Sequence, residues 1–215
     1  MSLTKDLAAL KADILPNIPE TIQTKMFADL EALAKSGLLE RAPKTGQKLT
    51  DFTLQNPKGE TVSLKQLRKN GPVVITFYRG GWCPYCNVEL RAYQQVLDKI
   101  IAAGAALVAI TPELPDASLS TTEKNDLRFE VLTDEHSKYA HEINIMFTIS
   151  KEIAEIYKGF GIDVEAHNGT GQFNVPLAAT FVVDKEGILQ FAFTAADYTV
   201  RADPEEIIKE LNSLN

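Results

Sequence analysis

Hydrophobic residues recur at helical spacing along the first part of the chain. Leu3, Leu7 and Leu10 fall on one face of a helix, which Pro16 ends. Apolar positions with the same spacing follow and predict a second helix. We expect residues 1–44 to form a helical N-terminal arm, which either packs on the rest of the chain or pairs two copies of it as a homodimer.

After the arm, the pattern changes to short apolar runs separated by turns. Asn56-Pro-Lys-Gly59 lies between two short β-type runs and predicts a hairpin. The runs 73–78 and 105–110 are continuous and apolar, as strands covered on both faces are. Helical spacing between these two runs indicates a parallel strand–helix–strand unit. Asp184-Lys-Glu-Gly187 predicts a second hairpin near the end of the chain.

The order of these elements predicts the α/β class. We expect a central mixed β-sheet flanked by helices, built as one domain from residues 45–215. Residues 159–175 contain four glycines and are expected to be irregular. Pro204 is placed to start a final helix.

Composition excludes several classes of function. Hydrophobic residues make up 45% of the chain and charged residues 24%, with a net charge of −7. No dense run of Lys and Arg is present, which argues against binding to nucleic acid or to an anionic membrane. The N-terminus lacks the uninterrupted apolar core of a signal peptide, and no stretch approaches the length of a membrane span. We therefore expect a cytoplasmic location.

The chain has two cysteines, and both lie in Trp82-Cys-Pro-Tyr-Cys86. A disulfide between them closes a very short loop and would add little stability. A tetrahedral zinc site needs two more ligands, and His136, His141 and His167 do not repeat a ligand spacing with the pair. We expect no metal and no cofactor. Inert buried thiols remain an alternative to the redox chemistry that the motif indicates.

The position of the motif explains how a sulfur there could react. The motif follows a predicted strand and opens a predicted helix, where Pro84 suits the first helical position and makes Cys83 the N-cap. Backbone N–H groups and the helix dipole favour a thiolate there, and Arg79 adds a positive charge nearby. Residues three apart bring both sulfurs within bonding range, so that one attacks and the other resolves the product. Trp82 and Tyr85 are expected to shield the pair and to offer an apolar surface to a partner protein.

Longer stretches around the motif resemble a known family. They are Phe77-Tyr-Arg-Gly-Gly-Trp-Cys-Pro-Tyr-Cys86, Asn87-Val-Glu-Leu90, Ile110-Thr-Pro-Glu-Leu-Pro115, Val131-Leu-Thr-Asp134, Ala179-Thr-Phe-Val-Val-Asp-Lys-Glu-Gly187 and Asp197-Tyr-Thr-Val-Arg-Ala-Asp-Pro204. Over roughly residues 45–212 the chain resembles the peroxiredoxin-like branch of the alkyl hydroperoxide reductase/thiol-specific antioxidant family. This resemblance implies a thioredoxin-like fold with an N-terminal β-hairpin, and peroxide reduction at the expense of a dithiol donor.

Two registers of this resemblance assign opposite roles to the cysteines. Aligning Phe77-Tyr78 with the peroxiredoxins puts Cys86 on their peroxidatic cysteine and Glu89 on a glutamate common in the family. Aligning the WCxxC motif with the thioredoxins instead makes Cys83 the exposed nucleophile and Cys86 the buried resolving residue. The resemblance leaves both assignments open.

One further position departs from the family. Where peroxiredoxins often carry a helper arginine, this chain has Ala178. Arg79 and Arg201 are the candidates to replace it.

The leading hypothesis is a thiol-dependent peroxidase that reduces hydrogen peroxide or organic hydroperoxides through a Cys83/Cys86 dithiol–disulfide cycle. A thioredoxin- or glutaredoxin-like donor would then reduce the enzyme. The alternative is a thiol–disulfide oxidoreductase acting on protein disulfides. A redox-sensing interaction module is the third hypothesis.

Overall fold

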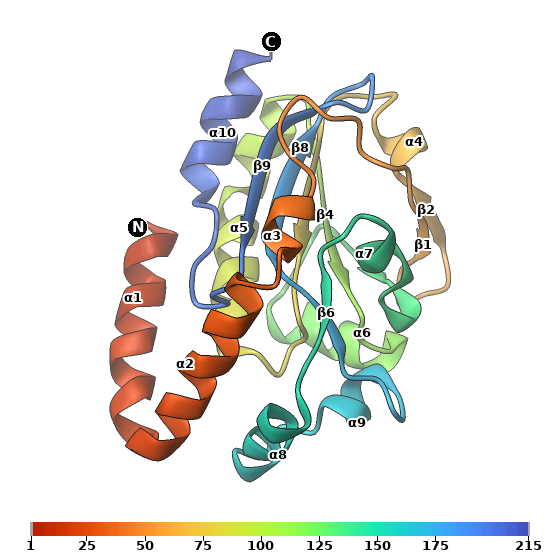
Figure 1. The fold of residues 1–215 in the computed structure, drawn as a ribbon. Helices are drawn as coiled ribbons and strands as arrows, with labels where there is room; N and C mark the ends of the chain where they lie inside the picture. Colours follow the sequence, from red (N-terminus) through yellow and green to blue (C-terminus); the bar gives the residue numbers. More distant parts are fainter. Residues whose placement is uncertain (1, 215) are drawn as a thin grey trace.

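The computed structural model describes residues 2–214, and a seven-stranded sheet lies at its centre (Figure 1). The strand order is β2-β1-β5-β4-β3-β8-β9. The strands are β1 (Thr53–Gln55), β2 (Thr61–Ser63), β3 (Val73–Phe77), β4 (Ala106–Thr111), β5 (Glu130–Thr133), β8 (Ala178–Val183) and β9 (Leu189–Ala195). Strands β3, β4 and β5 run parallel, and the other pairs are antiparallel. The predicted mixed sheet is confirmed.

The middle of the sheet is buried on both faces because its strands carry apolar side chains on both. All five residues of β3 are buried. Successive side chains of a strand point to opposite faces. Accordingly, Val74 belongs to the hydrophobic core on one side of the sheet, and Val73 and Ile75 belong to the core on the other.

Helices cover each face of the sheet. The core on one face includes residues of α1 (Leu3–Ile14), α5 (Pro84–Ala102) and α10 (Pro204–Ser213). The core on the other face includes residues of α3 (Leu38–Arg41), α4 (Leu64–Leu67) and α7 (Lys138–Glu142). Helix α6 (Pro115–Lys124) follows β4, and the 3₁₀ turn η2 (Glu135–Ser137) precedes α7. None of the helices described is long and apolar enough to cross a membrane.

The N-terminal segment forms a helical hairpin from α1, η1 (Leu15–Asn17) and α2 (Glu20–Ala34), drawn in red and orange in Figure 1. Helix α1 packs on α5, and α2 packs on α8 (Lys151–Gly159). Leu3 and Leu7 carry the first contact and are almost completely buried. The hydroxyl of Ser2 donates a hydrogen bond to Asp203 Oδ2 at 2.8 Å, which ties the start of the hairpin to the start of α10. The use of this arm to pair two copies of the chain stays a prediction.

The prediction of an irregular backbone over 159–175 is wrong in part. The segment contains α9 (Val164–Asn168) and ends in β7 (Asn174–Pro176), which pairs with β6 (Met146–Thr148) in a small second sheet. Asp163 caps α9 by accepting hydrogen bonds from two backbone N–H groups. Elements this short show no hydrophobic period, so the sequence alone did not reveal them.

Candidate active site

The cysteine motif lies at the junction of β3 and α5, with Cys83 as the N-cap and Pro84 as the first helical residue, as predicted. Two glycines shape the loop that leads into it. Gly80 has a φ of +148° and no room for a Cβ, because one would overlap the Trp82 indole. A Cβ on Gly81 would overlap the hydroxyl of Thr121 on α6. The close approach of α6 therefore requires glycine at this point of the loop.

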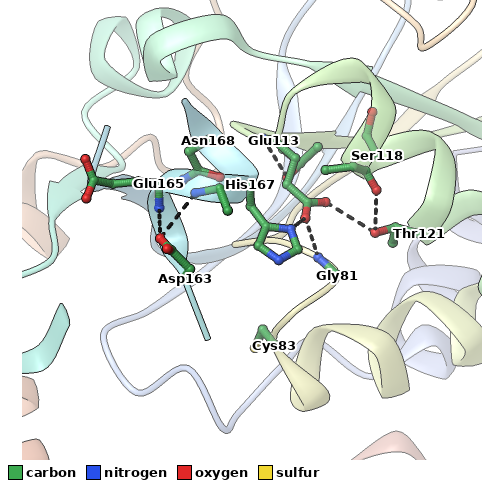
Figure 2. Close-up of polar contacts among 12 residues, drawn as sticks. Gly81, Cys83, Glu113, Ser118, Thr121, Asp163, Glu165, His167 and Asn168 are labelled. Atoms are coloured by element: carbon green, nitrogen blue, oxygen red, sulfur yellow. Dashed lines mark hydrogen bonds and ion pairs between the residues drawn. The ribbon is translucent and has the colours of Figure 1, made fainter. Parts of the chain in front are cut away.

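A buried carboxylate holds the same loop from the next strand (Figure 2). Glu113, which follows β4, accepts a hydrogen bond from the backbone N–H of Gly81 at 2.9 Å. Its two carboxylate oxygens also lie 3.0 Å from His167 Nδ1 and 3.3 Å from the hydroxyl of Thr121. Glu113 thus fixes the position of the segment that carries Cys83.

Both cysteines are free thiols and both are buried, Cys83 at 2% exposure and Cys86 at 0%. Burial opposes ionisation of Cys83. A hydrogen bond with Cys86 and the charges of Arg79 and Arg201 outweigh this effect and lower the pKa of Cys83 to about 6. Burial raises the pKa of Cys86 well above its usual value, and the hydrogen bond and charge of Cys83 raise it further. Cys83 is therefore the cysteine that ionises first.

Cys86 lies against a buried ion pair. Arg201 Nη2 donates to the Cys86 sulfur at 3.3 Å, and Arg201 Nε donates to Glu89 Oε2 at 2.6 Å. The other oxygen of Glu89 accepts from the hydroxyl of Thr76 at 3.0 Å. Burial raises the pKa of Glu89 to about 7, although the charge of Arg201 opposes this shift.

Arg79 lies on the Cys83 side of the motif inside a group of aromatic rings. Its guanidinium carbon is 4.6 Å from the ring centre of Tyr198, 4.9 Å from that of Trp82 and 5.4 Å from that of Tyr157. Arg79 Nη2 donates to the hydroxyl of Tyr157 at 2.8 Å. The rings and this hydrogen bond hold a positive charge beside Cys83 in a buried position.

An apolar cavity of about 410 Å³ opens onto Cys83. Its lining includes Cys83 but not Cys86. Its lining comes from the helical hairpin, the β3–α5 junction, the segment 157–162 and the segment 197–199. Cys83 is therefore the cysteine that a small molecule in the cavity would meet.

The structure places the expected site residues in two groups. Arg79, Trp82 and Tyr85 surround Cys83 and line the cavity beside it. Glu89 and Arg201 surround Cys86 instead. The roles of all these residues stay predictions.

Sequence reasoning missed Glu113, His167 and the tyrosines around Arg79. Glu113 carried a usable signal, because parallel strands end at the same edge of a sheet and Glu113 follows the strand next to β3. His167 and Tyr157 carried none, since only the tertiary fold brings their segments to the motif. Tyr198 lies beside the candidate Arg201 in a stretch that resembles the family, so that stretch was the available signal. Among the described residues, no group of three or more His, Cys, Asp or Glu side chains is placed to hold a metal ion.

A mixed sheet with a dithiol at a strand-to-helix junction is the arrangement of a thiol oxidoreductase with a thioredoxin-like fold. The chain belongs to the AhpC/TSA family, whose sequence profile matches residues 45–192. The helical hairpin and Arg201 both lie outside the matched segment.

Known peroxiredoxins are similar to this chain in sequence, and a related crystal structure is similar in fold. The chain is 29% identical to the chloroplastic peroxiredoxin Q of Populus jackii over 169 residues, which cover 79% of this chain and 68% of that one. It is 26% identical to peroxiredoxin Bcp of Bacillus subtilis over 144 residues, covering 67% of this chain and 80% of the relative. The fold is similar to the crystal structure of peroxidoxin BcpB from Mycobacterium tuberculosis, with a TM-score of 0.63, 18% identity, and coverage of 80% of this chain and 98% of the other.

Proposed function

We propose that this chain is a thiol peroxidase in which Cys83 attacks the peroxide and Cys86 resolves the product. The observation that carries this assignment is the position of Cys83. It lines the cavity, has a pKa lowered to about 6 against the effect of its burial, and shares a hydrogen bond with Cys86. Membership of the AhpC/TSA family and the relatives named peroxiredoxin support peroxide as the substrate.

The two cysteine sulfurs supply both electrons needed to reduce one peroxide, and a separate donor then reduces the disulfide they form. The Cys83 thiolate attacks the terminal oxygen of ROOH and the O–O bond breaks, which leaves a sulfenic acid on Cys83 and releases ROH once the alkoxide takes a proton. The thiol of Cys86 then displaces the hydroxyl from Cys83, which forms the Cys83–Cys86 disulfide and releases water. A dithiol donor returns both residues to thiols and is itself oxidised.

The two arginines serve the two halves of this cycle. Arg79, held among its aromatic neighbours, stabilises the Cys83 thiolate and the negative charge that develops on the leaving oxygen. Arg201, oriented by Glu89, donates to the Cys86 sulfur and would stabilise that sulfur as its proton leaves during resolution. This assignment follows the thioredoxin-like register of the motif rather than the peroxiredoxin register.

The donor belongs to the same proposal. A thioredoxin- or glutaredoxin-like protein is the expected reductant, and the cytoplasm, where such donors keep thiols reduced, is the expected location. Access to the sulfurs does not separate peroxides from protein disulfides, because a protein donor must reach the same pair of cysteines. Membership of the AhpC/TSA family is what favours peroxides as the oxidising substrates.

The test follows the oxidation of the pre-reduced protein by hydrogen peroxide and by cumene hydroperoxide, with mass spectrometry and a sulfenic acid trap. The wild type should form the internal disulfide faster than a free dithiol does. Cys86→Ser should stop at a trapped sulfenic acid on Cys83, whereas Cys83→Ser should react no faster than a free thiol. A sulfenic acid on Cys86 in the Cys83→Ser variant would reverse the two roles. Failure of both peroxides to react with the wild type would overturn the peroxidase assignment.

A further inference from the structure

The cavity over Cys83 has a wall that the family match does not include. The helical hairpin contributes six apolar side chains to it. They are Ile14, Leu15, Ile18, Met26, Phe27 and Leu30. All six precede residue 45, where the match to the AhpC/TSA family begins. The shape of the space in front of Cys83 is therefore set in part by a segment outside the match to the family.

The rest of the lining combines aromatic rings with two unsatisfied donors, Arg79 Nε and Trp82 Nε1. Trp82, Tyr85 and Tyr157 present aromatic surface to the cavity, and Arg79 lies among them. Arg79 is 3% exposed, yet its Nε makes no hydrogen bond to any residue that the structure describes. A buried donor without a partner costs about 1–3 kcal/mol, and an oxygen acceptor bound beside it would remove that cost.

We infer that the helical hairpin makes this enzyme selective for hydroperoxides that carry a bulky hydrocarbon group. This inference rests on the proposed peroxidase function and names its substrate class. The hydroperoxide oxygens lie at Cys83, where Arg79 supplies a positive charge. The hydrocarbon group packs against the hairpin wall and releases water from the cavity.

Hydrogen peroxide has no group that could use this wall. It gains the contact with Arg79 but leaves the apolar part of the cavity unfilled. The discrimination therefore comes from apolar contacts that only the larger substrate makes. Filling the cavity from the hairpin side should remove the advantage of the larger substrate.

The test measures second-order rate constants for oxidation of the reduced protein by cumene hydroperoxide and by hydrogen peroxide. Ile18→Phe adds volume inside the cavity from the hairpin. The ratio of the two rate constants, cumene hydroperoxide over hydrogen peroxide, should fall by about tenfold. Ala28→Phe is the matched control, because Ala28 is exposed on α2 and does not line the cavity. That control should keep the wild-type ratio.

A binding measurement keeps the inference testable if the larger side chain disturbs the hairpin. Trp82 is the single tryptophan of the chain and lines the cavity, so its fluorescence reports on a bound molecule. 2-Phenyl-2-propanol, the alcohol that cumene hydroperoxide leaves after reaction, should quench it saturably in the Cys86→Ser variant. Adding Ile18→Phe should weaken this binding, and adding Ala28→Phe should not.

The outcomes separate the two claims. A wild type that reacts with neither peroxide overturns the peroxidase function and this inference with it. A wild type that reacts with both, while Ile18→Phe leaves the ratio unchanged, overturns the inference alone. The absence of saturable binding by 2-phenyl-2-propanol also overturns the inference and leaves the peroxidase function standing.

Discussion

At the scale of single residues, the two sulfurs of one motif lie in different electrostatic environments. Cys83 lines the cavity and lies near the charge of Arg79. Cys86 accepts a hydrogen bond from the buried Arg201, which also pairs with Glu89. A thiolate is the nucleophilic form of cysteine. The hydrogen bond with Cys86 and the charges of Arg79 and Arg201 therefore favour the thiolate of Cys83 over that of Cys86.

Arg79→Met tests whether the charge of Arg79 stabilises the Cys83 thiolate. The wild-type pKa of about 6 for Cys83 means that its alkylation by iodoacetamide should rise as pH increases through that value and then level off. Removing the positive charge should move the midpoint upward by at least about one pH unit, since an opposite charge at close range lowers a pKa by that order. The measurement is the alkylation rate of Cys83 against pH, followed by mass spectrometry, in the variant and in the wild type.

Arg128→Met provides the matched control for that substitution. Arg128 is an exposed arginine that pairs with Asp98 at 2.9 Å and is not among the groups that shift the pKa of Cys83. Its profile should match the wild type. An unshifted midpoint in Arg79→Met would mean that Arg79 does not stabilise the thiolate.

At the scale of elements, the helical hairpin depends on tertiary packing for its stability. Leu3 and Leu7 of α1 join the core formed by α5 and α10. An isolated helix of this length is only marginally stable in water. Forming its first turn costs conformational entropy, and each further residue adds only one hydrogen bond to offset it. The hairpin therefore keeps its place over the cavity through the apolar face of α1.

Leu7→Ala should show this dependence. Leu7 is 3% exposed, and truncating a buried leucine typically lowers the free energy of unfolding by about 2–5 kcal/mol. Lys5→Ala, at an exposed position of the same helix, should change it by no more than about 0.5 kcal/mol. Urea unfolding followed by circular dichroism measures both. Equal stabilities for the two variants would show that α1 contributes nothing through Leu7.

At the scale of the whole molecule, both ends of the chain enclose the site. The hairpin covers the cavity from the N-terminal side, and the loop before α10 brings Tyr198 and Arg201 to the motif from the C-terminal side. Lys11 joins the two segments by donating to the hydroxyl of Thr199 at 3.2 Å. Because Cys83 is 2% exposed, we expect a large molecule to reach its sulfur only when these segments open.

The enclosure predicts a size-dependent reactivity of Cys83. In the folded Cys86→Ser protein, a maleimide attached to a long polyethylene glycol chain should react more slowly than a small maleimide by about tenfold or more, because its reaction waits for local opening. In urea, where the enclosure is lost, the two rates should approach each other. Mass spectrometry of the labelled protein gives both rates. The same ratio in folded and unfolded protein would contradict the enclosure.

The sequence by itself determined most of the elements and the position of the cysteine pair. Hydrophobic spacing predicted the two helices of the arm and the buried strands. Helices and strands each leave a characteristic repeat of apolar residues in the local sequence. The CxxC motif and Pro84 predicted Cys83 as the N-cap for the same reason, since a helix start is a local event.

Only the tertiary structure decided what surrounds that pair. Arg201 lies 115 residues from Cys86 along the chain, and His167 lies 54 residues from Glu113, yet each pair is in contact. Such pairs depend on how the whole sheet and its loops pack, which no local pattern encodes. The same is true of the cavity, whose walls come from segments far apart in the sequence. This packing gives two cysteines of one short motif different pKa values and different access to small molecules.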